Sequence, residues 1–217
     1  MLGRVLDRVR CVDAPLTVVV ATSDREIDDV IAAFAEQEGA AVFRGAADDL
    51  VARALTCTDA FNFESFVRIS GDSPFIDWRM IDRLLESHIR TGADLTTNVK
   101  VRSYPSGASV EIVRACALRR LADETSDPQD REHLTRHFYA APDRYSIVNH
   151  ECADDRYAGV RLVVDTEDDL RRAEYIMSEL NEPIEQASLD WVAELAKKHT
   201  AMPVGCELLS INRESGT

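Results

Sequence analysis

The 217-residue sequence has no closely spaced cysteine pair and very few lysines. Its five cysteines are odd in number and widely separated, so no C-x-x-C motif is available for a structural zinc site or a redox couple. We therefore expect reduced thiols and a cytoplasmic location. Lysine stands only at positions 100, 197 and 198, so arginine supplies nearly all the positive charge and suits bidentate pairing with carboxylates or phosphates.

An excess of basic residues and a long apolar run are also absent. The 25 basic and 39 acidic residues give a net charge of −14, a field that repels a nucleic-acid backbone. Arginines interrupt the apolar residues of the first twelve positions, which argues against a signal peptide. The uncharged run from Leu16 to Ser23 is far shorter than the ~20 residues that cross a bilayer. We expect no nucleic-acid partner and no membrane span.

The nine glycines are scattered, so neither G-x-x-x-x-G-K-[ST] nor G-x-G-x-x-G occurs. This excludes P-loop nucleotide hydrolysis and the usual dinucleotide-binding turn. The sequence also lacks the G-x-S-x-G motif of serine hydrolases.

What is present is an alternation of apolar runs and amphipathic helices. This alternation predicts an α/β fold with a mostly parallel sheet covered by helices on both faces. One helix has an apolar face of Ile27, Val30, Ile31 and Phe34, which we expect to pack on the sheet. We interpret 1–217 as one domain that ends in a helix and tail over 181–217. We expect strands at 16–21, 41–43, 66–69, 94–97, 110–113, 145–149 and 160–164, and helices that include 2–10, 116–124, 129–139, 167–180 and 189–198.

Two carboxylates follow predicted strands directly. Asp72 stands in the turn Ser70-Gly71-Asp72-Ser73-Pro74, and Asp165 follows Leu162-Val163-Val164. Ligands bind at the carboxyl edge of open α/β sheets, so we expect both side chains to face one crevice and to hold Mg²⁺. Asp72 could instead only shape its turn, and the acidic residues 167–169 are explained by the helix dipole.

Six segments together resemble the cytidylyltransferase family of the spore-coat polysaccharide type, which is related to CMP-KDO and CMP-sialic acid synthetases. They lie in order over residues 1–180: VVVATS at 18–23, VFRG at 42–45 with DLVAR at 49–53, RISGDSPFID at 68–77, YPSGASVE at 104–111, REHLT at 131–135 and VVDTEDDL at 163–170. The resemblance implies a Rossmann-like nucleotide-diphospho-sugar transferase fold. It also implies transfer of CMP from CTP to a sugar acid, with Mg²⁺ and release of pyrophosphate, by a protein that forms a homodimer.

The resemblance also assigns residues to roles. It places Asp72 and Asp165 as catalytic residues and metal ligands, with Arg131 and His133 as further catalytic residues. The implied nucleotide-binding residues are Ala21, Thr22, Ser23 and Arg44, and the implied substrate-binding residues are Tyr104 and Glu111.

The sequence departs from the family at two places. The family's first strand and its Gly/Arg/Lys-containing phosphate loop have no counterpart ahead of the first helix, and Ser109 replaces the usual Asp before Val-Glu. We therefore expect little turnover by the chain as written. The alternatives are an inactive or N-terminally incomplete member acting as a binding or scaffold module, and a sugar transferase of the related fold, for which an Asp-x-Asp cluster is missing. His133 and His137 lack the Glu placement of a zinc protease motif.

Overall fold

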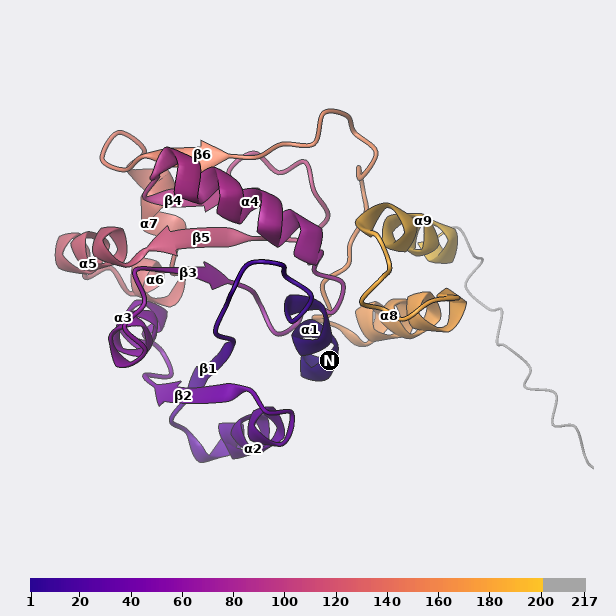
Figure 1. The fold of residues 1–217 in the computed structure, drawn as a ribbon, viewed down its shortest axis with the longest axis horizontal. Coiled ribbons are helices and arrows are strands. Elements are labelled where there is room, and N and C mark those ends of the chain that lie inside the picture. Colours follow the sequence, from indigo (N-terminus) through magenta and orange to yellow (C-terminus); the bar gives the residue numbers. More distant parts are fainter. Residues whose placement is uncertain (201–217) are drawn as a thin grey trace, which may run out of the picture.

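The computed structural model describes residues 1–200, so residues 201–217 of the predicted tail lie outside the described part of the chain. Helices and strands alternate along it as the sequence predicts (Figure 1). The strands are β1 (Val19–Ser23), β2 (Ala41–Gly45), β3 (Ser65–Arg68), β4 (Leu95–Thr97), β5 (Glu111–Arg114) and β6 (Ile147–Asn149). The helices are α1 (Leu2–Val9), a 3-10 turn η1 (Glu26–Asp28), α2 (Asp29–Gln37), α3 (Leu50–Ala60), α4 (Trp78–Thr91), α5 (Ala115–Glu124), α6 (Pro128–Glu132), α7 (Arg136–Ala140), α8 (Glu167–Glu179) and α9 (Leu189–Thr200).

The strands form two sheets. β1 pairs with β2 in parallel, and β3, β5, β4 and β6 form a second sheet in that order. In the second sheet β4 and β6 are parallel, whereas β5 runs antiparallel to both β3 and β4. The predicted α/β class is confirmed, with the addition that the larger sheet is mixed because β5 reverses direction.

Both faces of the larger sheet are covered by apolar side chains. Ile112 and Val113 are adjacent on β5, so their side chains point to opposite faces. Ile112 packs with Ile81 and Leu84 of α4, whereas Val113 belongs to a cluster with Leu118 of α5. The sheet is therefore the middle layer between α4 on one side and the α5–α7 region on the other (Figure 1).

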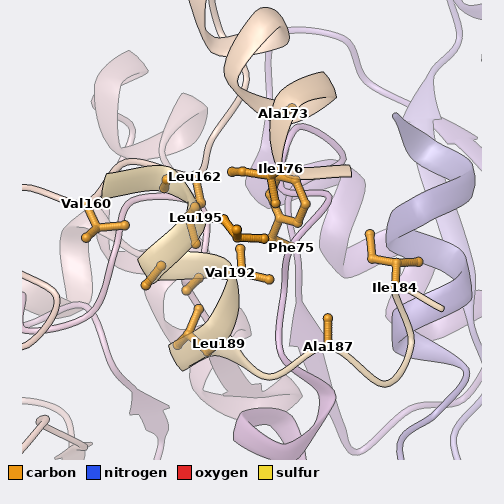
Figure 2. Packing of buried hydrophobic residues seen from close by; sticks show 13 residues of the cluster. Phe75, Val160, Leu162, Ala173, Ile176, Ile184, Ala187, Leu189, Val192 and Leu195 are labelled. Atoms are coloured by element: carbon orange, nitrogen blue, oxygen red, sulfur yellow. The ribbon is translucent and has the colours of Figure 1, made fainter. Parts of the chain in front are cut away.

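A third apolar cluster lies beside the sheet, under α8 and α9. Figure 2 shows Phe75 next to Ile176 of α8 and close to Val192 and Leu195 of α9. These four side chains are at most 1% exposed. The apolar stripe of the last helix therefore covers the chain's own core, and no helix in the described residues is long and apolar enough to cross a membrane.

The buried guanidinium of Arg8 ties α1 to this region. It donates hydrogen bonds to the backbone carbonyl of Ile76 and to those of Ile184 and Ala187, two parts of the chain that are far from α1 and from each other in sequence. Because three carbonyls accept from it, the charged side chain can be fully buried at 0% exposure.

Three local predictions are wrong. The helix expected over 129–139 is split, because His133 leaves the helical conformation and Leu134 turns into an apolar cluster. Residues 160–164 form no strand, because only an isolated bridge joins Arg161 to Ser106 and the backbone N–H groups of the segment donate to separate carbonyls, those of Tyr157, Ser106 and Asp72. The expected apolar face of α2 is open to solvent, and the helix buries two alanines instead.

Candidate active site

A crevice of about 350 Å³ brings together residues from distant parts of the chain. Asp72 enters it from the turn after β3, Glu111 from the start of β5, and Asp165 from the segment before α8. Three arginines line the same space, at positions 68, 102 and 161. The crevice therefore combines fixed negative and positive charges, which can hold a metal ion beside an anionic ligand.

Backbone contacts hold Asp72 and Asp165 side by side. The Val164 N–H donates to the Asp72 carbonyl oxygen over 3.0 Å. Just before this contact, the Leu162 and Val163 N–H groups both donate to the carbonyl of Ser106, over 2.7 and 3.0 Å. The two carboxylates thus face one crevice as expected, although they do not follow neighbouring parallel strands.

Gly107 allows this close approach. Its φ of +93° lies in the region that favours glycine, and a Cβ there would lie 2.4 Å from the Val163 nitrogen. Any side chain at Gly107 would push away the segment that carries Asp165. The turn at Gly107 must therefore keep this conformation for Asp72 and Asp165 to lie in the same crevice.

A buried hydrogen-bond network forms the floor of the crevice. Both oxygens of the Glu111 carboxylate, which is 4% exposed, accept hydrogen bonds: from Arg68 Nη1 over 2.6 Å and from the Tyr139 hydroxyl over 2.6 Å. The Tyr139 hydroxyl also lies 3.0 Å from Thr97 Oγ1. Burial raises the pKa of Tyr139 well above its ordinary value, so the phenol stays protonated and keeps donating. Glu111 therefore fixes the Arg68 guanidinium at the crevice.

The other two arginines differ in their partners. Arg161 donates to Asp165 over 2.6 Å and to Asp169 over 2.9 and 3.0 Å. Hydrogen bonding to Arg161 is the main reason why the pKa of Asp169 lies far below its ordinary value. Arg102 is exposed and forms no ion pair with any carboxylate of residues 1–200. One crevice arginine is thus free to meet an anion.

The residues expected at the nucleotide lie at the end of β1 and β2, outside the lining of this crevice. The buried Thr22 and Ser23 hydroxyls both donate to Asp28. Arg44 donates to the carbonyls of Ser23 and Arg25 over 2.8 Å each, and to Asp29. Ala21 is the exposed member of this set. These polar groups fix the strand end rather than project into the crevice.

Three other expected site residues lie elsewhere. Arg131 donates through two nitrogens to Asp49, the N-cap of α3, and so ties α6 to α3. His133 is exposed at the end of α6. Tyr104 lines a second cavity, next to Tyr157, with ring centroids 5.6 Å apart. Their predicted roles in catalysis and substrate binding gain no support from position.

Four residues line the crevice that the sequence does not predict there: Arg68, Arg102, Tyr139 and Arg161. A signal existed for two of them, since Arg68 directly precedes the Ile-Ser-Gly-Asp turn and Arg161 stands four positions before Asp165. Neither Tyr139 nor Arg102 lies close in sequence to Asp72 or Asp165, so no such signal exists for them.

The donor set of the crevice fits magnesium better than zinc. No group of three or more His, Cys, Asp and Glu side chains gathers anywhere in residues 1–200, as a zinc site would need. Two carboxylates, Asp72 and Asp165, do meet at the crevice. Mg²⁺ is commonly bound by one or two carboxylates, with substrate phosphates and water completing its octahedron. The two aspartates are therefore a suitable pair of protein ligands.

Known proteins resemble this chain in sequence. A sequence model of the cytidylyltransferase family matches residues 1–197. The spore coat polysaccharide biosynthesis protein SpsF of Bacillus subtilis is 30% identical over 155 residues, which are 70% of this chain and 63% of that protein. The uncharacterized protein MJ1063 of Methanocaldococcus jannaschii is 26% identical over 155 residues, 71% of this chain and 63% of its own length. The chain thus spans less than two thirds of these relatives.

Solved structures share the fold. A cytidylyltransferase from Leptospira borgpetersenii superposes with a TM-score of 0.86 at 27% identity, covering 92% of this chain and 83% of that one. CMP:2-keto-3-deoxy-manno-octonic acid synthetase, solved with CTP, gives a TM-score of 0.59 at 17% identity, over 82% of this chain and 87% of that one. This second likeness concerns the fold alone.

Proposed function

Since the chain belongs to the cytidylyltransferase family, we propose that it transfers CMP from CTP to a sugar acid or a related sugar and releases pyrophosphate. The named relative SpsF supports a product used in polysaccharide biosynthesis. The proposal includes a cytoplasmic homodimer that needs Mg²⁺.

One observation carries the proposal: Asp72 and Asp165 meet in a crevice that also contains arginines. In transfer of a nucleotidyl group, the acceptor hydroxyl attacks the α-phosphorus of the triphosphate and pyrophosphate leaves. Little covalent help is required from the protein, so charge neutralisation and positioning supply most of the rate. Paired carboxylates and guanidinium groups supply both.

Each charged group has a distinct role in this proposal. Asp72 and Asp165 would hold Mg²⁺, which when bound neutralises charge on the phosphate oxygens. Arg68, fixed by the buried Glu111, presents a rigid positive charge toward the anionic reactants. Arg102, which has no carboxylate partner within the described chain, is available to pair with an acid group of the acceptor.

The decisive assay measures pyrophosphate release from CTP and Mg²⁺ with a panel of 2-keto sugar acids. In a form of the protein that turns over, we expect Asp72→Asn and Asp165→Asn to lower kcat by ~10²-fold or more, because each removes a metal ligand. Melting temperatures should stay close to that of the unchanged protein. Asp168→Asn is a matched control, since Asp168 is three residues from Asp165 but 85% exposed and, within residues 1–200, paired only with Arg171.

Nucleotide choice is tested separately by thermal shift. CTP with Mg²⁺ should stabilise the folded protein by ~2.7 kcal/mol at a hundredfold excess over Kd. This stabilisation should be larger than that given by ATP, GTP or UTP at the same concentration. CTP-specific binding without pyrophosphate release from any acceptor would favour the binding-module alternative. Equal shifts with all four nucleotides would refute the cytidine assignment.

A further inference from the structure

Arg161 stands between two carboxylates that are held very differently. Its Nη2 atom lies 2.6 Å from Asp165 Oδ2 and 3.0 Å from Asp169 Oδ2, and its Nε atom lies 2.9 Å from Asp169 Oδ1. The Asp165 side chain is 53% exposed, whereas that of Asp169 is 4% exposed. One guanidinium therefore joins a solvent-accessible carboxylate to a buried one.

Asp169 is committed to its position by several other contacts. It forms a capping box with Thr166 at the start of α8, and it accepts hydrogen bonds from the backbone N–H groups of Asp165 and Thr166. Arg172 also pairs with it. Without Arg161, Asp169 would still be paired with Arg172 and with backbone N–H groups. Asp169 in turn accepts two hydrogen bonds from Arg161 and so anchors that side chain.

Asp165 is held much less firmly. Within the described residues, Arg161 is the one side chain that pairs with its carboxylate. An ion pair as exposed as this is weak and easily exchanged. The guanidinium can therefore leave Asp165 while it stays attached to Asp169.

We propose that Arg161 is a positioning residue that couples metal binding to nucleotide binding. It competes with a lone divalent cation for the Asp165 carboxylate. When a phosphate group enters the crevice together with the cation, the guanidinium turns from Asp165 to a phosphate oxygen and Asp165 turns to the cation. This inference rests on the proposed function, because it uses Asp165 as a metal ligand.

The charges set the direction of the effect. A positive group 2.6 Å from a ligand oxygen repels a cation that binds the same oxygen, even where water screens the interaction. We expect its removal to tighten the binding of a lone cation about tenfold. Its removal should also weaken the nucleotide-bound cation by several-fold, because a guanidinium–phosphate pair is lost.

The test is a titration of the full chain with Mn²⁺, followed by electron paramagnetic resonance, with and without CTP. Arg161→Gln should bind Mn²⁺ alone about tenfold more tightly than the unchanged protein, and Mn²⁺ with CTP less tightly. Arg161→Lys keeps the charge and should stay near the unchanged affinity for Mn²⁺ alone. Arg172→Gln is the matched control, because Arg172 contacts Asp169 but not Asp165, and it should change neither affinity.

Two results would overturn the inference: no tightening of Mn²⁺ alone in Arg161→Gln, or the same tightening in Arg172→Gln. Failure of the proposed function looks different. If Asp165→Asn binds Mn²⁺ with CTP as well as the unchanged protein does, Asp165 is not a metal ligand and the proposed site itself is wrong. If Asp165→Asn loses that binding while Arg161→Gln changes nothing, only the role of Arg161 is refuted.

Discussion

The unit of residues 19–45, which contains β1, α2 and β2, is held together differently from the larger sheet. The three buried apolar clusters of the described chain include no residue of this unit. Its apolar side chains on η1 and α2 are open instead, with Ile27 79% and Val30 72% exposed. The larger sheet has the opposite arrangement, since Ile112 and Val113 of β5 are both fully buried.

Polar contacts do most of the ordering in the 19–45 unit. Asp28 accepts hydrogen bonds from the Thr22 hydroxyl over 3.0 Å and from the Ser23 backbone N–H over 3.1 Å. Arg44 crosses from β2 to bind backbone carbonyls near the end of β1. A hydrogen bond contributes about 1 kcal/mol net, whereas a buried large apolar side chain contributes several. Such a unit can hold a strand end in place and still open locally before the rest of the molecule.

The largest expected difference concerns two phenylalanines. Phe75 is 1% exposed in the cluster under α8 and α9, so Phe75→Ala should lower the free energy of unfolding by about 3–5 kcal/mol. Phe34 on α2 is 37% exposed, and Phe34→Ala should cost clearly less. Urea unfolding followed by circular dichroism measures both. Equal losses would show that the α2 face is covered in solution. The 19–45 unit would then not differ from the rest of the molecule in its apolar burial.

A smaller effect is expected for Ser23→Ala, which removes the hydroxyl that donates to Asp28. The loss of about 1 kcal/mol should raise the hydrogen-exchange rates of β1 and β2 amides roughly fivefold. Exchange in β5 and α4 should not change, because their protection comes from the apolar clusters. Mass spectrometry of deuterated peptides checks this. A uniform increase over the whole chain would mean that the 19–45 unit opens only with global unfolding.

The same contact predicts a dependence on pH. Hydrogen bonds, first from the Ser23 hydroxyl, lower the pKa of Asp28 below its ordinary value of 3.8. The carboxylate therefore stabilises the folded unit above pH 3.8, and this stabilisation is lost as the pH falls through the lower, folded pKa. Protection of β1 amides should be greater in the unchanged protein than in Asp28→Asn near neutral pH, and the difference should vanish in acid. A difference that persists in acid would contradict the prediction.

Features that depend on neighbouring residues can be predicted from the sequence alone. Asp49, Asp77 and Thr166 each cap the helix that follows, because a cap needs only a side-chain oxygen near the next two or three N–H groups. Asp72 and Asp165 face one crevice as expected, although no strand forms before Asp165 and backbone contacts to Ser106 and Asp72 bring its segment there. The expected α/β class rested on local periodicity.

Features that depend on distant contacts were not predicted. The break after α6 exists because Leu134 packs into a cluster built from several other elements. The pairing of Arg131 with Asp49, the N-cap of α3, joins residues 82 positions apart. The Tyr139 hydroxyl is held at the crevice by Glu111 and Thr97, which are 28 and 42 positions away in the sequence. The spacing of apolar residues along the chain does not predict which distant side chains will pair.

The smallest expected effect comes from Val30→Ser on α2, and it tests the one apolar face that the sequence misjudged. Val30 is 72% exposed, so the change removes little buried surface and should alter the free energy of unfolding by no more than about 0.5 kcal/mol. The matched change is Val192→Ser on α9, where the side chain is 0% exposed among apolar neighbours. There the loss of buried methyl groups and the burial of a hydroxyl should cost about 3 kcal/mol. Both variants can be compared by urea unfolding at several protein concentrations. A loss above about 1.5 kcal/mol for Val30→Ser, growing with protein concentration, would show that a second copy of the chain covers this face, since only association makes stability depend on concentration.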